Sequence, residues 1–201
     1  FIKGGWINRN NILVNGSKHQ FSFSLEKSST FSKINERKFD QKKKETEQKK
    51  FLKTIHLAYS KAPYFDIIYP LLETIQATYT SDLSESIYNS LKGVCNYLDI
   101  ETELLLSENV SYDRNADAQH KVIDICLKLN GNCYTNAIGG IELYSREAFK
   151  SKGIELNFLK TNPIAYQQFN NEFVTGLSII DVMMFNSHDQ IKEMLELYNL
   201  E

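Results

Sequence analysis

The chain has 201 residues and a formal net charge of −2. Its length suits one well-buried core, and its charge creates no overall field that would attract nucleic acid or an anionic membrane. Hydrophobic residues make up 42% and charged residues 24% of the sequence, which is typical of a globular domain. No run approaches the roughly 18 apolar residues that a membrane span needs, and we identify no signal peptide. We therefore expect a cytoplasmic protein with no integral membrane segment.

The N-terminal sequence predicts a β-hairpin around Asn15-Gly16, because both positions of a type I′ turn require a positive φ angle. A two-residue loop pairs Asn10 with Phe21 across the hairpin and places Asn8 on the same face. Two amides on an apolar face need hydrogen-bond partners, since an unpaired buried amide costs about 1–3 kcal/mol. The partners are either a ligand or backbone carbonyl groups of a preceding segment, and the sequence leaves both alternatives open.

Two cations lie near these asparagines in the sequence. Arg9 is suited to bidentate binding of a phosphate or carboxylate, although the predicted register turns it to the opposite, polar face. Lys3 precedes a Gly-Gly pair and would belong to a flexible cationic loop. Because the chain starts at Phe1 and enters strand-like sequence almost at once, we expect it to be a fragment of a longer protein.

The middle of the chain predicts a helical block over residues 41–99. Apolar residues recur there at helical spacing in three stretches, 41–59, 64–78 and 81–98. The first stretch opens with a lysine-rich run from Lys42 to Lys50. Acidic residues and glutamines interrupt the run, so we interpret it as a solvated helix face and expect no nucleic-acid partner.

The second half of the chain alternates between predicted strands and helices. The strands are expected at 102–106, 133–136 and 154–158, and the helices between them at 117–129 and 145–152. This order predicts an α/β fold with a small, mainly parallel βαβαβ sheet beside the N-terminal β-hairpin and the three-helix block. We expect a single α/β domain over residues 1–201.

Glycine and proline residues indicate where several predicted elements begin or end. Gly131 is expected at the C′ position of the helix that precedes it, and Gly153 should end the short helix at 145–152. After an extended stretch that opens at Pro163, two further helices are predicted at 178–185 and 189–198.

The sequence contains no strong catalytic signature. It has no G-x-G-x-x-G motif, no P-loop, no G-x-S-x-G motif and no C-x-x-C motif. The four histidines and three cysteines do not fall at metal-ligand spacing. We therefore predict no metal site, and the sequence indicates no particular cofactor.

Asn136, Gly139 and Gly140 follow a predicted parallel strand, and ligands bind at the carboxyl ends of such strands. Paired glycines let a backbone approach a ligand closely, but they serve an ordinary tight turn equally well. The turn is the simpler interpretation, and substrate binding is the alternative.

Asp181 lies in the apolar stretch 178–185, where an unpaired acid would be costly to bury. A structural explanation is that Ser178 and Asp181 have the spacing of a capping box at a helix N-terminus. The alternative is a catalytic role for Asp181. The sequence leaves both open, and we favour the cap.

Four segments of the sequence resemble the WbqC-like protein family. They are Phe1 to Asn10, Tyr134 to Gly140 with Leu143-Tyr144, Tyr166-x-Gln168-Phe169, and Leu177 to Asn186. The resemblance covers nearly the whole chain in the expected order. Ala137 departs from it, because the family usually has proline before Ile-Gly-Gly. Members usually begin with a further strand–loop–helix segment, which also implies that this chain is truncated.

The resemblance implies a transferase of bacterial surface-polysaccharide (O-antigen-type) biosynthesis that forms an amide between an amino acid or acyl group and an amino sugar. The partner would be a sugar or nucleotide-sugar substrate, bound between the hairpin and the parallel strands. The family does not assign roles to individual residues, so the roles in this hypothesis come from the residues themselves. Asp181 would be the catalytic base, and the substrate-binding residues would be Lys3, Asn8, Arg9, Asn10, Asn136, Gly139 and Gly140. A non-catalytic sugar- or nucleotide-binding protein and a nucleotide-activating ligase are the alternatives.

Overall fold

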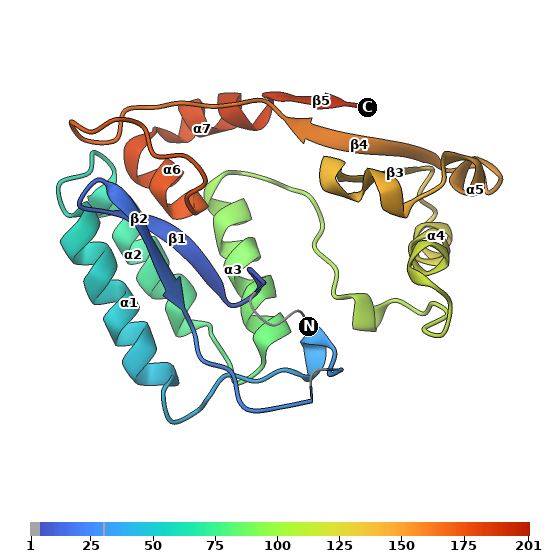
Figure 1. Ribbon diagram of the computed structural model, residues 1–201, viewed down its shortest axis with the longest axis horizontal. Helices are drawn as coiled ribbons and strands as arrows, with labels where there is room; N and C mark the ends of the chain where they lie inside the picture. The colour runs from blue at the N-terminus through green and yellow to red at the C-terminus, as the bar shows by residue number, and fades with distance from the viewer. Residues whose placement is uncertain (1–4, 30) are drawn as a thin grey trace. The chain divides into compact units, whose positions relative to one another are not determined.

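The computed structural model of the chain describes residues 5–29 and 31–201 (Figure 1). The chain divides into two compact units, each described here by itself. Unit 1 comprises Phe1–Thr102 and Ala165–Glu193, and unit 2 comprises Glu103–Ile164 and Met194–Glu201. Lys3, one of the predicted substrate-binding residues, lies outside the described residues.

Unit 1 begins with the predicted β-hairpin, formed by β1 (Arg9–Val14) and β2 (Ser17–Ser22). The turn residues Asn15 and Gly16 have φ angles of 50° and 73°, as a type I′ turn requires. Asn10 pairs with Phe21, so the predicted register is confirmed. In this register the asparagines and the phenylalanines of the hairpin share one face.

The three-helix block is also confirmed, with α1 at Lys44–Tyr59, α2 at Phe65–Ala77 and α3 at Leu83–Tyr97 (Figure 1). Asp82 caps α3 by accepting a hydrogen bond from the Glu85 N–H at 3.0 Å. A short 3₁₀ helix, η1 (Ile34–Glu36), lies in the loop that connects the hairpin to α1.

Two C-terminal helices contribute to unit 1, namely α6 (Ile179–Phe185) and α7 (His188–Leu195) as far as Glu193. The Phe51 ring of α1 packs 4.8 Å from Phe21 and 5.6 Å from Phe23, measured between ring centroids. One buried core therefore joins the hairpin to the helices. Its fully buried members include Ile12, Leu13, Ile55, Ile68, Leu83, Leu98, Met183 and Met184.

Unit 2 has its own small core and a three-stranded mixed sheet. Its elements are η2 (Ser107–Asn109), α4 (Ala118–Lys128), β3 (Cys133–Ala137), η3 (Ile138–Leu143), α5 (Arg146–Lys150), β4 (Glu155–Thr161) and β5 (Tyr198–Leu200). The strand order is β3-β4-β5, with β3 parallel to β4 and β5 antiparallel to it. The protein is thus of mixed α/β class, and its two small sheets replace the expected mainly parallel βαβαβ sheet.

The sheet differs from the prediction at two places. Residues 102–106 form no strand, whereas β5 begins at Tyr198, the last residue of the helix predicted at 189–198. An extended segment becomes a strand only when a neighbour completes its hydrogen bonds. β5 pairs with the edge of β4 that faces away from β3. The pattern of residues within one segment could not reveal which segments pair.

The end of α4 differs from the prediction by one residue. Asn130, not Gly131, has the left-handed conformation, with a φ angle of 55°. The Asn130 N–H donates to Leu127 O, and the Gly131 N–H donates to Cys126 O at 2.7 Å. This is a Schellman motif with asparagine at C′, which is permitted because asparagine tolerates the left-handed region. The predicted end of α5 at Gly153 is confirmed by its φ angle of 73°.

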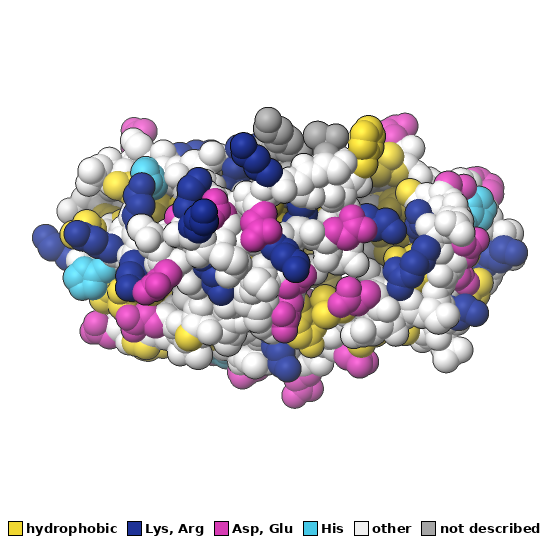
Figure 2. All heavy atoms as spheres, turned by 90° about the horizontal axis from the view of Figure 1, so that it is seen from below, with side chains coloured by type: hydrophobic (Ala, Val, Ile, Leu, Met, Phe, Trp, Pro, Cys, Tyr) yellow, Lys and Arg dark blue, Asp and Glu magenta, His cyan; other side chains and the backbone are white. Residues whose placement is uncertain are grey.

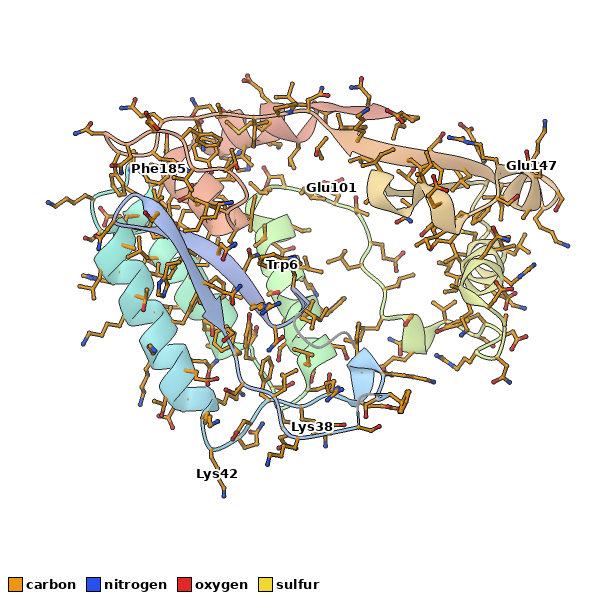
Figure 3. All side chains as sticks on the ribbon, viewed as in Figure 1. Trp6, Lys38, Lys42, Glu101, Glu147 and Phe185 are labelled. Atoms are coloured by element: carbon orange, nitrogen blue, oxygen red, sulfur yellow. The ribbon has the colours of Figure 1, made fainter. Side chains whose placement is uncertain are left out.

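Two of the lysines at the start of α1 have structural partners. The Lys44 ammonium group donates to the Tyr79 carbonyl oxygen at 2.6 Å, and Lys49 forms an ion pair with Glu45 at 2.6 Å. Figure 3 shows the Lys42 side chain pointing away from the helix. Basic and acidic side chains are interspersed over the face shown in Figure 2. None of the helices among the described residues is long and apolar enough to cross a bilayer.

We predict that α1 binds no nucleic acid, because acidic partners offset its positive charge. Fluorescence anisotropy with labelled single-stranded and duplex oligonucleotides should detect no micromolar affinity at low salt. The matched variants Lys42→Glu and Lys50→Glu should behave like the wild type. Tight binding that falls steeply with salt, and that these substitutions abolish, would contradict the prediction.

Candidate functional site

The candidate site is a cavity of about 610 Å³ inside unit 1, between the hairpin and the helices. This volume lies within the roughly 300–1,000 Å³ range of small-molecule sites. Its walls come from the segment before β1, from β2, from α1, α2 and α3, and from the start of α6. Figure 3 labels Trp6, which lines the cavity together with residues of α3.

The walls of this cavity are mainly apolar and partly aromatic. The apolar side chains include Phe21, Phe23, Phe39, Phe51, Leu72, Ile75, Leu83, Ile87, Val94, Ile180 and Met183. The cavity therefore suits a ligand with an apolar body, since water that leaves such a surface contributes favourable binding free energy.

Asn8 and Asn10 line this cavity with Phe21 and Phe23, as the register predicted. The Asn8 side-chain Nδ2 donates to the Phe23 carbonyl oxygen at 2.8 Å, and Asn10 Oδ1 accepts the Asn11 N–H at 2.8 Å. Backbone groups of the hairpin itself thus satisfy half of each amide. Within the described residues, Asn8 Oδ1 and Asn10 Nδ2 have no partner and can meet polar groups of a ligand.

Arg9 also lines the cavity, although its position in the hairpin lies on the opposite face. Its Nε donates to the Gly5 carbonyl oxygen at 2.9 Å, and its guanidinium carbon lies 5.7 Å from the Trp6 ring centroid. These contacts turn the side chain back along the strand. Its two terminal nitrogens have no partner within the described part of the chain, so they can bind an anionic group.

Asp181 is fully buried, and its side chain is held by three donors. Tyr59 donates its hydroxyl to Oδ1 at 2.8 Å. Tyr166 and Gln168 each donate to Oδ2 at 2.7 Å. Tyr59 in turn accepts the buried Leu13 N–H at 2.7 Å. The carboxyl group thus links β1, the end of α1, the 166–168 segment and α6.

This arrangement corrects the capping-box interpretation. The Ser178 hydroxyl does cap α6, because it accepts the Ile180 N–H at 3.3 Å. The Ser178 N–H, however, donates to the Asn11 carbonyl oxygen at 2.8 Å, and no hydrogen bond joins it to Asp181. Sequence spacing could not reveal this, because Tyr59 lies 122 positions from Asp181.

Burial raises the pKa of Asp181 above its usual value of 3.8, and the hydrogen bonds from Tyr166, Tyr59 and Gln168 oppose that rise. Burial and the negative charge of Asp181 also raise the pKa of Tyr59. Asp181 does not line the cavity. Its predicted role as a catalytic base stays a prediction, and its geometry supports a role in positioning the surrounding segments.

Asn136, Gly139 and Gly140 belong to unit 2, at the carboxyl end of β3 and in η3. The Asn136 amide packs so closely against Gly140 that a Cβ at residue 140 would collide with its Nδ2, whereas Gly139 faces open space. A side chain at residue 139 would therefore meet no neighbour, whereas one at residue 140 would force the Asn136 amide to move. Their predicted role in substrate binding stays a prediction.

Several residues of this region were not identified as candidates from the sequence. Tyr59 and Gln168 hold Asp181, and Gln76 and Tyr79 line the cavity. Gln76 offered one usable signal, since it lies four positions after Leu72 on the buried face of a helix. Within the described residues, no group of three or more His, Cys, Asp or Glu side chains could hold a metal ion.

Comparison with known proteins gives one match. The model of the WbqC-like protein family matches residues 1–193 of the chain. No curated protein and no solved structure matches the chain.

Removing the Tyr59 hydroxyl should destabilise unit 1 more than removing the Tyr166 hydroxyl. Tyr59→Phe leaves both Asp181 Oδ1 and the Leu13 N–H without a partner, at a cost of about 1–3 kcal/mol for each group. Tyr166→Phe should cost on the order of 1 kcal/mol, because Oδ2 keeps its bond from Gln168. Urea unfolding of both variants measures the difference, and equal losses would show that the Leu13 bond contributes nothing.

The stability of the protein should depend on pH through Asp181. Its raised pKa means that the native state keeps a proton that the unfolded state has released, so its contribution is fully present below about pH 4. This contribution is lost as pH rises through the native pKa, by at most about 1.4 kcal/mol per pH unit. Urea unfolding between pH 4 and 8 should therefore show the wild type losing stability relative to Asp181→Asn. A difference that grows with pH in favour of the wild type would contradict the direction of this shift.

Proposed function

The chain belongs to the WbqC-like protein family, and from this premise we propose that it acts in bacterial surface-polysaccharide biosynthesis. In the proposed reaction the amino group of a sugar attacks the carbonyl carbon of an activated acyl or amino-acyl donor, such as a thioester. The amide bond forms, the bond between the acyl carbon and its leaving group breaks, and the leaving group takes up the proton that the amine loses. The cavity of unit 1 would bind the acyl portion of the substrate. Membership of the family supports a role in polysaccharide biosynthesis. The apolar wall of the cavity supports binding of the acyl portion there.

The chemistry of the cavity wall is the observation on which this proposal depends. A pyranose ring carries several hydroxyl groups, and each needs a hydrogen bond when it leaves water. The described wall offers few polar side chains, whereas its leucine, isoleucine and phenylalanine side chains fit an acyl chain. The sugar would therefore stay at the polar edge, where Asn8 and Asn10 present free amide atoms.

Arg9 would complete the polar edge. Its terminal nitrogens are suited to the phosphate of a nucleotide-linked or lipid-linked sugar, because a guanidinium group binds phosphate through two parallel hydrogen bonds. Asp181 would act behind the cavity, by fixing β1 and the start of α6 against each other. Its substitution would then change the shape of the site rather than remove a base.

A second candidate function is non-catalytic binding of an acylated sugar, and one observation favours it. Arg9 and Tyr79 are the titratable side chains that line the cavity among the described residues. Burial raises the pKa of Tyr79, so neither group is a base at neutral pH. Attack by an amine needs a group that removes its proton, and this group would have to come from elsewhere.

The protein can be tested for amide formation by mass spectrometry, with a nucleotide-linked amino sugar and a series of acyl thioesters. We expect a new acylated sugar. Ile87→Trp, which fills the cavity, should lower kcat/KM at least about 100-fold, whereas the exposed Leu57→Trp should leave it unchanged. Binding of an acylated sugar without turnover would support the second candidate. Full activity of Ile87→Trp would show that the acyl group binds elsewhere.

A further inference from the structure

Trp6, in the segment before β1, is an exposed aromatic side chain at the edge of the cavity in unit 1. It lines the cavity, yet its exposed fraction is 64% (Figure 3). A molecule that enters the cavity can therefore reach the indole ring. Covering an aromatic ring is favourable because its apolar surface leaves water, so this ring is suited to contact with a ligand.

Arg9 lies beside this ring and adds a positive charge to it. Its guanidinium carbon is placed over the ring, 5.7 Å from the centroid, and its Nε donates to the Gly5 carbonyl oxygen at 2.9 Å. A cation over one face of an indole leaves the opposite face for another flat group. The terminal nitrogens of Arg9 keep the paired geometry that binds phosphate. Trp6 and Arg9 together thus offer an aromatic face and an anion-binding group.

The charge of the cavity wall favours an anionic ligand at this place. Among the described residues, no Asp or Glu side chain lines the cavity, so no carboxylate of the wall competes with a ligand for Arg9. A sugar ring alone brings no charge, and a fatty acyl chain brings no aromatic ring. A nucleotide brings both features, because its ribose joins a flat aromatic base to phosphate groups.

We propose that Trp6 stacks on the base of a nucleotide-linked sugar while Arg9 binds its phosphate groups. This inference rests on the proposed function, in which the sugar phosphate is linked to a nucleotide or to a lipid, and it assigns the nucleotide. A base gains from the flat face of an indole, whereas a lipid chain gains only from apolar area. Trp6 is therefore a specificity-determining residue for the sugar donor or acceptor that enters the cavity.

Trp6 is the single tryptophan of the chain, so tryptophan fluorescence reports on this position alone. Uridine diphosphate and guanosine diphosphate supply a pyrimidine and a purine base. At least one of them should quench the emission in a saturable titration, because a base stacked on the ring changes its surroundings. Inorganic pyrophosphate carries the charge without the base, and it should bind more weakly.

Isothermal titration of variants separates the base from the phosphate groups. Trp6→Ala should weaken binding of the nucleotide about 5- to 150-fold, as expected for the loss of one stacked base. Trp6→Phe should lose less, and it should bind pyrophosphate like the wild type because a ring remains beside Arg9. Arg9→Gln should weaken binding of both the nucleotide and pyrophosphate. Phe31→Ala is the matched control, because Phe31 is 93% exposed and does not line the cavity.

Four outcomes separate this inference from its alternatives. Equal nucleotide affinity in the wild type and Trp6→Ala would overturn it. Binding of farnesyl phosphate that depends on Trp6, with no binding of either nucleotide, would overturn it in favour of a lipid-linked sugar. Acylation of an amino-sugar phosphate as fast as its nucleotide-linked form would overturn it and leave the proposed reaction intact. Nucleotide binding that depends on Trp6, without any acylated product, would support it and contradict the proposed reaction.

Discussion

Burial of the Asp181 carboxyl group without a cation is the constraint on which unit 1 depends. An isolated buried carboxylate would be too costly, so the fold must bring donors to it from distant parts of the chain. Tyr59, Tyr166 and Gln168 provide those donors. The end of α1, the 166–168 segment and α6 are therefore fixed at one point, and the Leu13 N–H adds β1 to the same network.

The network also decides the shape of the cavity. The Ser178 N–H bonds the Asn11 carbonyl oxygen, so the start of α6 is tied to β1 next to the Asp181 network. The strand that carries Asn8, Arg9 and Asn10 thus has a fixed position relative to the helix that carries Ile180 and Met183. Hydrogen bonds behind the wall therefore fix the position of its two sides relative to each other.

The sequence by itself determined the elements that depend on local contacts. The turn at Asn15-Gly16 set the hairpin register, which placed Asn8 and Asn10 beside the phenylalanines, and helical spacing located α1, α2 and α3. The family resemblance was likewise contained in short segments. Only the tertiary structure decided that β5 pairs with β4, and that distant tyrosines and a glutamine hold Asp181. The reason is that turns and helices close hydrogen bonds between residues a few positions apart, whereas strand partners and buried networks join residues that only the folded chain brings together.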